Sequence, residues 1–332
     1  MPNSHIVGTG SSIPKRVLSN YDLENIVDTS DEWITRRSGI KERRISSREE
    51  NESATDLATR ASLKALEMAG ISAESLDMIV VGTVTPDRQF PSTACMVQKE
   101  LNATNAASFD VSAGCSGFLY ALSVVHNAIS AGTCKTGLVV GVERLSTILN
   151  WTDRSTCVLL GDGAGAVVVS AAPKKGGILS THLKSNGHLW DLLYSSYRNG
   201  NTITPNALKE IDIKPFDLKM DGNPLFKRAV GYLSDIARAA LTHNALSSDD
   251  IELFVPHQAN IRIIQGMAKN LSIPLEKVYT NVHKYGNTSS ASIPLALDEA
   301  NREGRMKRGD HVLLVAFGAG LTWASSMLKW VI

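Results

Sequence analysis

Several features that assign a chain to a class of protein are scarce in this sequence. Cysteine occurs at only four of 332 positions, and Cys95, Cys115, Cys134 and Cys157 form neither a CxxC motif nor a Cys/His ligand spacing. This argues against a zinc site and against a disulfide framework. The formal net charge is only +1. A near-neutral balance argues against nucleic acid or an anionic membrane as the main partner, although local patches of charge stay open.

Long apolar runs are missing as well. No stretch approaches 18 apolar residues, and the first 20 residues lack the apolar core of a secretory signal. We therefore expect a cytoplasmic protein. What the chain does have is size, because 332 residues with 43% hydrophobic content suffice for two core units or one large layered domain.

The sequence contains an internal repeat. Apolar strand-like runs alternate with helical patterns, as an α/β layered fold requires. Three landmarks recur in one order at offsets of 172 to 174 residues: LDMIVVGT from Leu76 and DIELFVPH from Asp250, GCSGFLYAL from Gly114 and GNTSSASIPLAL from Gly286, GLVVGVE from Gly137 and DHVLLVAFG from Asp310. The pattern predicts two copies of one unit, residues 1–172 and 173–332, with an insertion at about 187–222. Two such halves packed face to face would share a cleft.

One cysteine stands where a strand gives way to a helix. Residues 110–118 read DVSAGCSGF, after a short apolar run at 107–111 that predicts a buried strand. The helical stripe that follows consists of Phe118, Leu119, Leu122, Val125 and Ile129. Unpaired amides and the helix dipole favour a thiolate at Cys115, so we predict a pKa below the free value of roughly 8.5. A buried structural cysteine in a flexible turn fits this stretch alone equally well.

The second copy adds two polar side chains at turn positions. His257 follows the apolar strand IELFV, and Asn287 lies in KYGNTSSAS, the counterpart of the Cys115 turn. A satisfied core histidine and a routine turn asparagine are the alternatives. The stretch LGDGAGAVVVS at 160–170 predicts a tight turn between buried strands, because no helix follows its glycines to hold a phosphate. The charged run RRSGIKERR at 36–44 is typical of a solvated face, or of a site for a phosphate-bearing ligand.

Four motifs together resemble one known family. DVSAGCSGF, VPHQANIRII, YGNTSSASIPLAL and AFGAGLTW are similar to those of the β-ketoacyl-(acyl carrier protein) synthase III family of the thiolase superfamily. DEWITRRSGIKERR, QFPSTAC, DRSTCVLLGDGAGA and KMDGNPLFKRAV extend the resemblance, in order, over nearly the whole chain. It implies a duplicated five-layer αβαβα thiolase fold, usually a homodimer. It also implies that the protein condenses a short acyl-CoA with malonyl-acyl carrier protein, the reaction that initiates type II fatty acid synthesis. Acetyl-CoA is the first hypothesis for the acyl-CoA.

The resemblance implies roles for particular residues. Cys115 would accept the acyl group and complete a triad with His257 and Asn287, while the backbone amides of Cys115 and Ala319 would hold the oxyanion. No metal or redox cofactor is implied. The remaining implied contacts are Thr29, Trp33, Arg37, Arg154 and Asn260 for CoA, Phe90 for the partner's acyl pocket across the dimer, and Lys227 and Arg262 for the acidic carrier protein.

Two departures from the family pattern leave parts of this interpretation open. The familiar glycine triplet reads Gly-Ala-Gly at 318–320 and precedes Leu321, where an aromatic residue is common, so acyl length is open. Ser155 follows Arg154 where glycine is frequent, which weakens the adenine contact. A secondary-metabolism ketoacyl synthase or acyltransferase with another acyl starter is therefore the alternative. A non-catalytic scaffold for acylated carrier protein is a third hypothesis, against which the intact triad argues.

Overall fold

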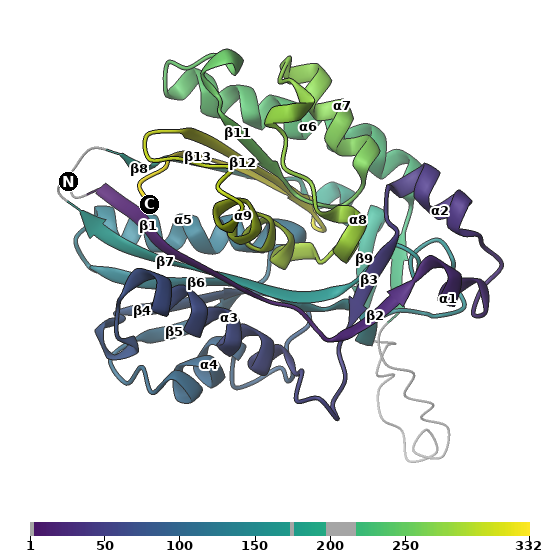
Figure 1. Ribbon diagram of the computed structural model, residues 1–332, viewed down its shortest axis with the longest axis horizontal. Helices are drawn as coiled ribbons and strands as arrows, with labels where there is room; N and C mark the ends of the chain where they lie inside the picture. Colours follow the sequence, from purple (N-terminus) through teal and green to yellow (C-terminus); the bar gives the residue numbers. More distant parts are fainter. Residues whose placement is uncertain (1–2, 173–175, 197–216) are drawn as a thin grey trace.

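The first half of the chain forms a five-stranded sheet. The computed structural model describes residues 3–172, 176–196 and 217–332 (Figure 1). The strand order is β1-β7-β6-β4-β5, with β4 parallel to both neighbours and β7 antiparallel to both of its own. The strands are β1 (Asn3–Ser12), β4 (Met78–Gly82), β5 (Ala107–Val111), β6 (Thr136–Arg144) and β7 (Asp162–Ala172).

The second half repeats this arrangement. Its sheet has the order β11-β12-β13-β8, and an isolated parallel bridge from Phe254 to Val278 takes the place that β5 has in the first sheet. The strands are β8 (Gly177–Ser185), β11 (Leu253–Pro256), β12 (His311–Gly318) and β13 (Thr322–Lys329). The spatial order β8-β13-β12-β11 in the second sheet matches the order β1-β7-β6-β4 in the first. The duplication is therefore visible in the sheet topology.

Helices separate and cover the two sheets, so that five layers stack (Figure 1). α5 (Gly117–Ser130) and α9 (Ser292–Arg302) lie in the middle layer, where α5 contacts strands of both sheets. α3 (Ala54–Ala69) and α4 (Thr93–Leu101) pack on the first sheet, α6 (Gly222–His243) packs on the second, and α7 (Ile261–Leu271) packs against α6. This is the αβαβα architecture that the sequence resemblance implied. Within the described ranges, no helix combines the length and the apolarity needed to cross a bilayer.

Smaller elements surround one end of the stack. β2 (Arg16–Ser19) and β3 (Glu42–Ile45) form an antiparallel pair, and β9 (Leu193–Ser196) pairs with β10 (Asp217–Met220). Three short helices are α1 (Asn20–Glu24), α2 (Asp31–Ser38) and α8 (Val282–Tyr285). β9 and β10 belong to the predicted insertion at about 187–222, of which residues 197–216 lie outside the described residues. The predicted boundary at 172/173 also borders residues outside that description.

The helical stripe predicted from the sequence forms as expected. Phe118, Leu119, Leu122, Val125 and Ile129 of α5 are all buried. Since the middle layer faces a sheet on each side, its helices bury apolar residues more fully than an outer helix does. This burial fixes α5, and with it the turn that carries Cys115.

Three sequence predictions need correction. Residues 107–111 form a strand, but β5 lies at the edge of its sheet and is partly exposed rather than buried. Residues 162–170 continue as strand β7 and not as a turn. The repeat offset is 175 residues at the key turn, so the counterpart of Gly114 is Ser289 and not Gly286. Both residues have a left-handed backbone, with φ of 54° and 49°.

Candidate active site

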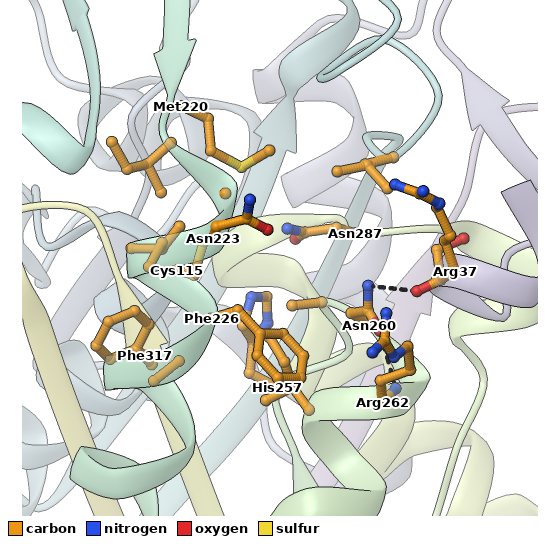
Figure 2. Close-up of a pocket in the computed structure, with 18 of the residues that line it drawn as sticks. Arg37, Cys115, Met220, Asn223, Phe226, His257, Asn260, Arg262, Asn287 and Phe317 are labelled. Carbon is orange, nitrogen blue, oxygen red and sulfur yellow. Dashed lines mark hydrogen bonds between the residues drawn. The ribbon is translucent and has the colours of Figure 1, made fainter.

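A cavity of about 560 Å³ brings the predicted triad together (Figure 2). Cys115 from the first half and His257 and Asn287 from the second half all line it. Its other walls come from α2, the β9–β10 pair, and the first turns of α6 and α7. The cavity therefore lies between the two copies of the repeat, where the face-to-face packing of the halves was expected to place it.

Cys115 lies in a tight turn just before α5. The turn Gly114–Ser116 is a single 3₁₀ turn, and α5 follows directly at Gly117. A side chain at Gly114 would come within 2.6 Å of the Ala319 amide nitrogen, and one at Gly318 would overlap the Cys115 amide nitrogen. Two glycines thus allow the turn after β12 to touch the cysteine turn. The predicted oxyanion residues, Cys115 and Ala319, are neighbours as a result.

The ionisation of Cys115 differs from the sequence prediction. Burial, together with the nearby Glu143 carboxylate and against the opposing effect of the Ser289 hydroxyl, raises the pKa of the thiol to about 12. The prediction of a lowered pKa was wrong because removal of water from the thiolate outweighs the help of the helix end. In the resting protein the sulfur is a thiol.

His257 is held as a neutral imidazole with a defined tautomer. Its backbone amide pairs with Val315 of β12, and burial lowers the pKa of its ring to about 3. Nδ1 lies 2.6 Å from the Ser292 hydroxyl, which also accepts a weak hydrogen bond of 3.4 Å from the Gln258 amide. We assign the serine proton to Nδ1, because no other acceptor for it is found among the described residues, and this leaves the ring proton on Nε2. His257 offers a neutral N–H donor at neutral pH.

Hydrogen bonds also fix the orientation of Asn287. Its Oδ1 accepts a hydrogen bond of 2.8 Å from the Ser289 amide, so that the NH₂ group is left to face away from this turn. Its backbone is fixed on both sides, because its N–H donates to Leu159 and its carbonyl accepts from Gly161. In Figure 2 the side chains of Cys115, His257 and Asn287 face a common space. The site thus combines a thiol with two fixed neutral donors.

Four of the five residues predicted for CoA lie at or beside the cavity. Trp33, Arg37 and Asn260 line it, and the Asn260 side chain donates to the Arg37 carbonyl at 3.0 Å (Figure 2). The guanidinium carbons of Arg37 and Arg154 lie 4.6 Å and 5.2 Å from the Trp33 ring centroid. Thr29 does not line the cavity, and its hydroxyl is buried without a partner among the described residues.

The residues predicted for partners are exposed. Lys227 and Arg262 line the cavity and reach solvent, and the Arg262 guanidinium lies 5.5 Å from the Phe226 ring centroid. Phe90 is 83% exposed and does not line the cavity of its own chain.

Sequence reasoning missed several residues of the site. Met220, Asn223 and Phe226 also line the cavity (Figure 2), and Ser292 and Glu143 support it from behind. Glu143 could have been identified from the sequence, because it ends the apolar run GLVVGVE. A carboxylate buried there needs hydrogen-bond donors around it.

The charged run at 36–44 is not a solvated face throughout. Arg43 is fully buried and donates to the carbonyls of Leu18 and Val158 and to the Asn20 side chain. Arg37 of the same run lines the cavity, so the alternative of a ligand site remains for that residue.

Fold and site together define a thiolase-fold acyltransferase. Two family profiles match the chain, 3-oxoacyl-[acyl-carrier-protein] synthase III over residues 109–187 and the C-terminal region of the same synthase over residues 241–330. The chain belongs to the β-ketoacyl-[acyl-carrier-protein] synthase III family.

Individual relatives cover almost the whole chain. The β-ketoacyl-[acyl-carrier-protein] synthase III of Caldanaerobacter subterraneus is 50% identical over 325 residues, which are 98% of this chain and 97% of that protein. The solved structure of the Aquifex aeolicus synthase is 48% identical, has a TM-score of 0.91, and covers 98% of this chain and 100% of its own. A priming β-ketosynthase of the R1128 polyketide pathway is 36% identical, with a TM-score of 0.91 and coverage of 99% and 97%.

Proposed function

We propose that this enzyme condenses a short acyl-CoA, with acetyl-CoA as the starter, with malonyl-acyl carrier protein. The products are 3-ketoacyl-acyl carrier protein, CoA and CO₂, which makes the reaction the first condensation of type II fatty acid synthesis. The observation that carries the proposal is a thiol that shares one cavity with two fixed neutral donors. Relatives at about half identity that bear the synthase name support the same conclusion.

In the first half-reaction, Cys115 attacks the thioester carbonyl of acyl-CoA. The sulfur–carbon bond to Cys115 forms while the thiol gives up its proton to a base, and CoA leaves as its thiolate, which takes a proton from solvent. Negative charge develops on the carbonyl oxygen during the attack. The amides of Cys115 and Ala319, held together by the close approach at Gly114 and Gly318, are the donors for that charge.

In the second half-reaction, malonyl-acyl carrier protein loses CO₂ and leaves an enolate on the thioester oxygen. His257 Nε2–H and the Asn287 NH₂ group donate to this oxygen. Because the pKa of His257 is about 3, the ring is neutral and keeps its proton as a donor at neutral pH. The enolate carbon then attacks the acyl group and expels the Cys115 sulfur. The sequence of steps balances without a metal or redox cofactor, so we propose none.

Substrate entry uses the residues around the cavity mouth. We assign the adenine of CoA to the space between Trp33 and Arg154, its phosphates to Arg37, and the pantetheine arm to Asn260. Thr29 is the least supported of these contacts because it lies outside the cavity lining. Lys227 and Arg262 are exposed cations beside the cavity, and we assign them to the acidic carrier protein.

The exposed edge of the first sheet supports a homodimer. β5 has no neighbour on one side among the described strands, and Phe109 on it and Phe90 near it are 38% and 83% exposed. An unpaired edge with apolar side chains is a natural surface for a second copy. Phe90 would then reach the partner's acyl pocket. The four cysteines are free, which supports the cytoplasm as the location.

A different acyl starter is the second candidate. The 36% identical priming ketosynthase shares this fold over the whole chain, and Leu321 replaces a common aromatic residue. The same triad would serve either pathway, so the choice depends on acyl length and branching.

The decisive experiment is the intact mass of the protein after incubation with acetyl-, propionyl-, branched and longer acyl-CoAs. We expect one added acyl mass, largest for acetyl-CoA, and its loss in Cys115→Ala. An adduct that persists in Cys115→Ala, or none with any acyl-CoA, contradicts the mechanism. A branched or longer acyl group in place of acetyl favours the second candidate.

A further inference from the structure

Behind the nucleophile lies a carboxylate that has no cationic partner among the described residues. Glu143 is the penultimate residue of β6 and is fully buried. Arg144, the next residue, turns to Ser46 and Asp87. The titratable group that faces Glu143 within the described ranges is the Cys115 thiol.

Hydroxyl groups and one amide surround Glu143 instead of a cation. Its carboxylate accepts from Thr85 Oγ1 at 2.5 Å, Ser289 Oγ at 3.2 Å, the Val84 amide at 3.2 Å and Thr83 Oγ1 at 3.4 Å. Ser290 Oγ lies 2.9 Å from the carboxylate and 2.8 Å from the Gly82 carbonyl, so these two oxygens share its one proton. Each of these donors is neutral. A buried carboxylate held in this way stays close to the balance between its two protonation states.

Ser289 connects this carboxylate to the nucleophile. The turn that carries Ser289 packs directly on the turn that carries Cys115, and the Ser289 hydroxyl lowers the pKa of the Cys115 thiol. The same hydroxyl lies 3.2 Å from Glu143 Oε1. A serine oxygen carries one proton, so it cannot donate to both neighbours at once. While Cys115 is a thiol, the consistent arrangement is S–H to Ser289 Oγ and O–H to Glu143. Ser289 is held here in a left-handed conformation, at φ 49°.

We propose that Glu143 receives the thiol proton of Cys115 through the hydroxyl of Ser289 as Cys115 attacks the acyl thioester. The S–H bond breaks and its proton passes to Ser289 Oγ, while the O–H proton of Ser289 passes to Glu143. The products are a nucleophilic sulfur, an unchanged serine and a neutral carboxylic acid. The inference rests on the proposed condensation and assigns the base that its first step needs.

The proton returns in the second half-reaction. When the enolate expels Cys115, the leaving thiolate takes a proton from Ser289, and Glu143 returns its own proton to the serine. Glu143 therefore starts and ends each turnover as a carboxylate. The only net proton consumed is the one that the CoA thiolate takes from solvent.

Electrostatics favour this route over direct loss of the proton to water. A thiolate beside a carboxylate would place two anions in one buried site, and Glu143 is one cause of the raised pKa of Cys115. Transfer to Glu143 keeps a single negative charge in the pair throughout. Burial raises the pKa of Glu143 to about 7 against the opposing pull of its donors, so the group is a usable base near neutral pH.

The competing explanation is that Glu143 only ties the turn at 289–290 to the first half of the chain. Both explanations predict a loss of activity in Glu143→Gln. They differ in the pH dependence of acylation, because a base must be deprotonated to act. The rate of Cys115 acetylation should rise with pH through the pKa of Glu143 in the relay, and should not do so for a purely structural tie.

The test measures the single-turnover rate of Cys115 acetylation by intact mass from pH 5.5 to 8.5. Glu143→Gln should lower the rate at pH 7.5 by about 100-fold, the usual lower range for a general base, and abolish the rise near pH 7. Asp162→Asn is the matched control, because Asp162 is a fully buried carboxylate held by Ser46 and Ser146 away from the cavity. The control should keep the rise at its original pH.

A second variant decides the matter if Glu143→Gln does not fold. Thr85→Val removes a donor from Glu143 but leaves the relay atoms in place, so it should move the rise in rate to higher pH. An unchanged pH profile in Glu143→Gln, or in Thr85→Val, overturns the relay. If either occurs while the wild type forms its adduct, the proposed condensation stands without it, whereas a wild type that forms no adduct refutes both.

Discussion

Ser292 should control the decarboxylation step through the tautomer of His257. Its hydroxyl lies 2.6 Å from Nδ1, and Ser292 and His257 are only 2% and 6% exposed. Ser292→Ala leaves Nδ1 without that partner and removes the reason for the ring proton to stay on Nε2. An unpaired buried polar atom costs about 1–3 kcal/mol. A bias of that size between two states corresponds to about 5- to 150-fold in population.

We therefore expect Ser292→Ala to slow CO₂ release from malonyl-acyl carrier protein by about 5- to 150-fold. Acetylation of Cys115 should change by less than a factor of about three, because the donors for that step are backbone amides. The assay acetylates Cys115 first, removes acetyl-CoA, and then follows CO₂ and ketoacyl product after addition of the carrier protein. The adduct is followed separately by mass.

Ser325→Ala is the matched control for this variant. Ser325 is equally buried and donates to the Ile236 carbonyl at 2.9 Å, away from the triad. It should lower the melting temperature but leave the ratio of the two half-reactions unchanged. Equal losses in both half-reactions of Ser292→Ala, or undiminished CO₂ release, would refute the role assigned to the tautomer.

Four further outcomes follow from the structure. Phe90→Ala should extend the range of acyl-CoAs that acylate the enzyme while acetyl transfer persists, and sedimentation of the parent should give a dimer; a fully active monomer contradicts this. Lys227→Glu with Arg262→Glu should raise KM for malonyl-acyl carrier protein several-fold and flatten its salt dependence, with acetylation by acetyl-CoA unchanged; unaltered carrier-protein binding at low salt places the docking site elsewhere. Gly318→Ala should cut acetylation at least about 100-fold, because the new methyl group overlaps the Cys115 amide that we assign to the oxyanion; a normal rate removes that amide from the mechanism. Glu143→Gln should gain thermal stability over the wild type at pH 8 relative to pH 5, because the raised pKa of Glu143, about 7, makes the native state bind more protons than the unfolded chain between those values; pH-independent differences in melting temperature contradict this sign.

The repeat, and the turn positions of the residues predicted to form the triad, were within reach of sequence reasoning. Strand and helix periods are local patterns, and a duplicated unit repeats them at a nearly fixed offset. The stripe on α5 and the turn positions of Cys115, His257 and Asn287 follow from residues close to them in the chain. Family resemblance then supplied the chemistry that those positions alone left open. The triad, oxyanion, CoA and carrier-protein assignments remain predictions for the experiments above.

The sequence did not show correctly which residues of the two copies correspond to each other. The sequence aligns Gly114 with Gly286 because both are glycines, whereas the fold superposes Gly114 on Ser289, which share a left-handed backbone. Identity of residue type misled the alignment, since a serine held by its surroundings occupies a conformation that glycine adopts freely. Likewise, the position of β5 at the edge of the sheet depends on which strands pair with it, and not on its own apolar residues.

The sequence by itself determined which residues stand at the ends of strands and helices, because periodicity, glycine turns and the internal repeat are local properties. Only the tertiary structure decided the protonation states of those residues and the directions of their hydrogen bonds. The raised pKa of Cys115 comes from burial and from Glu143, 28 positions away, and the tautomer of His257 comes from Ser292, 35 positions away. Desolvation and hydrogen-bond direction depend on every neighbour in space, and those neighbours come from both halves of the chain.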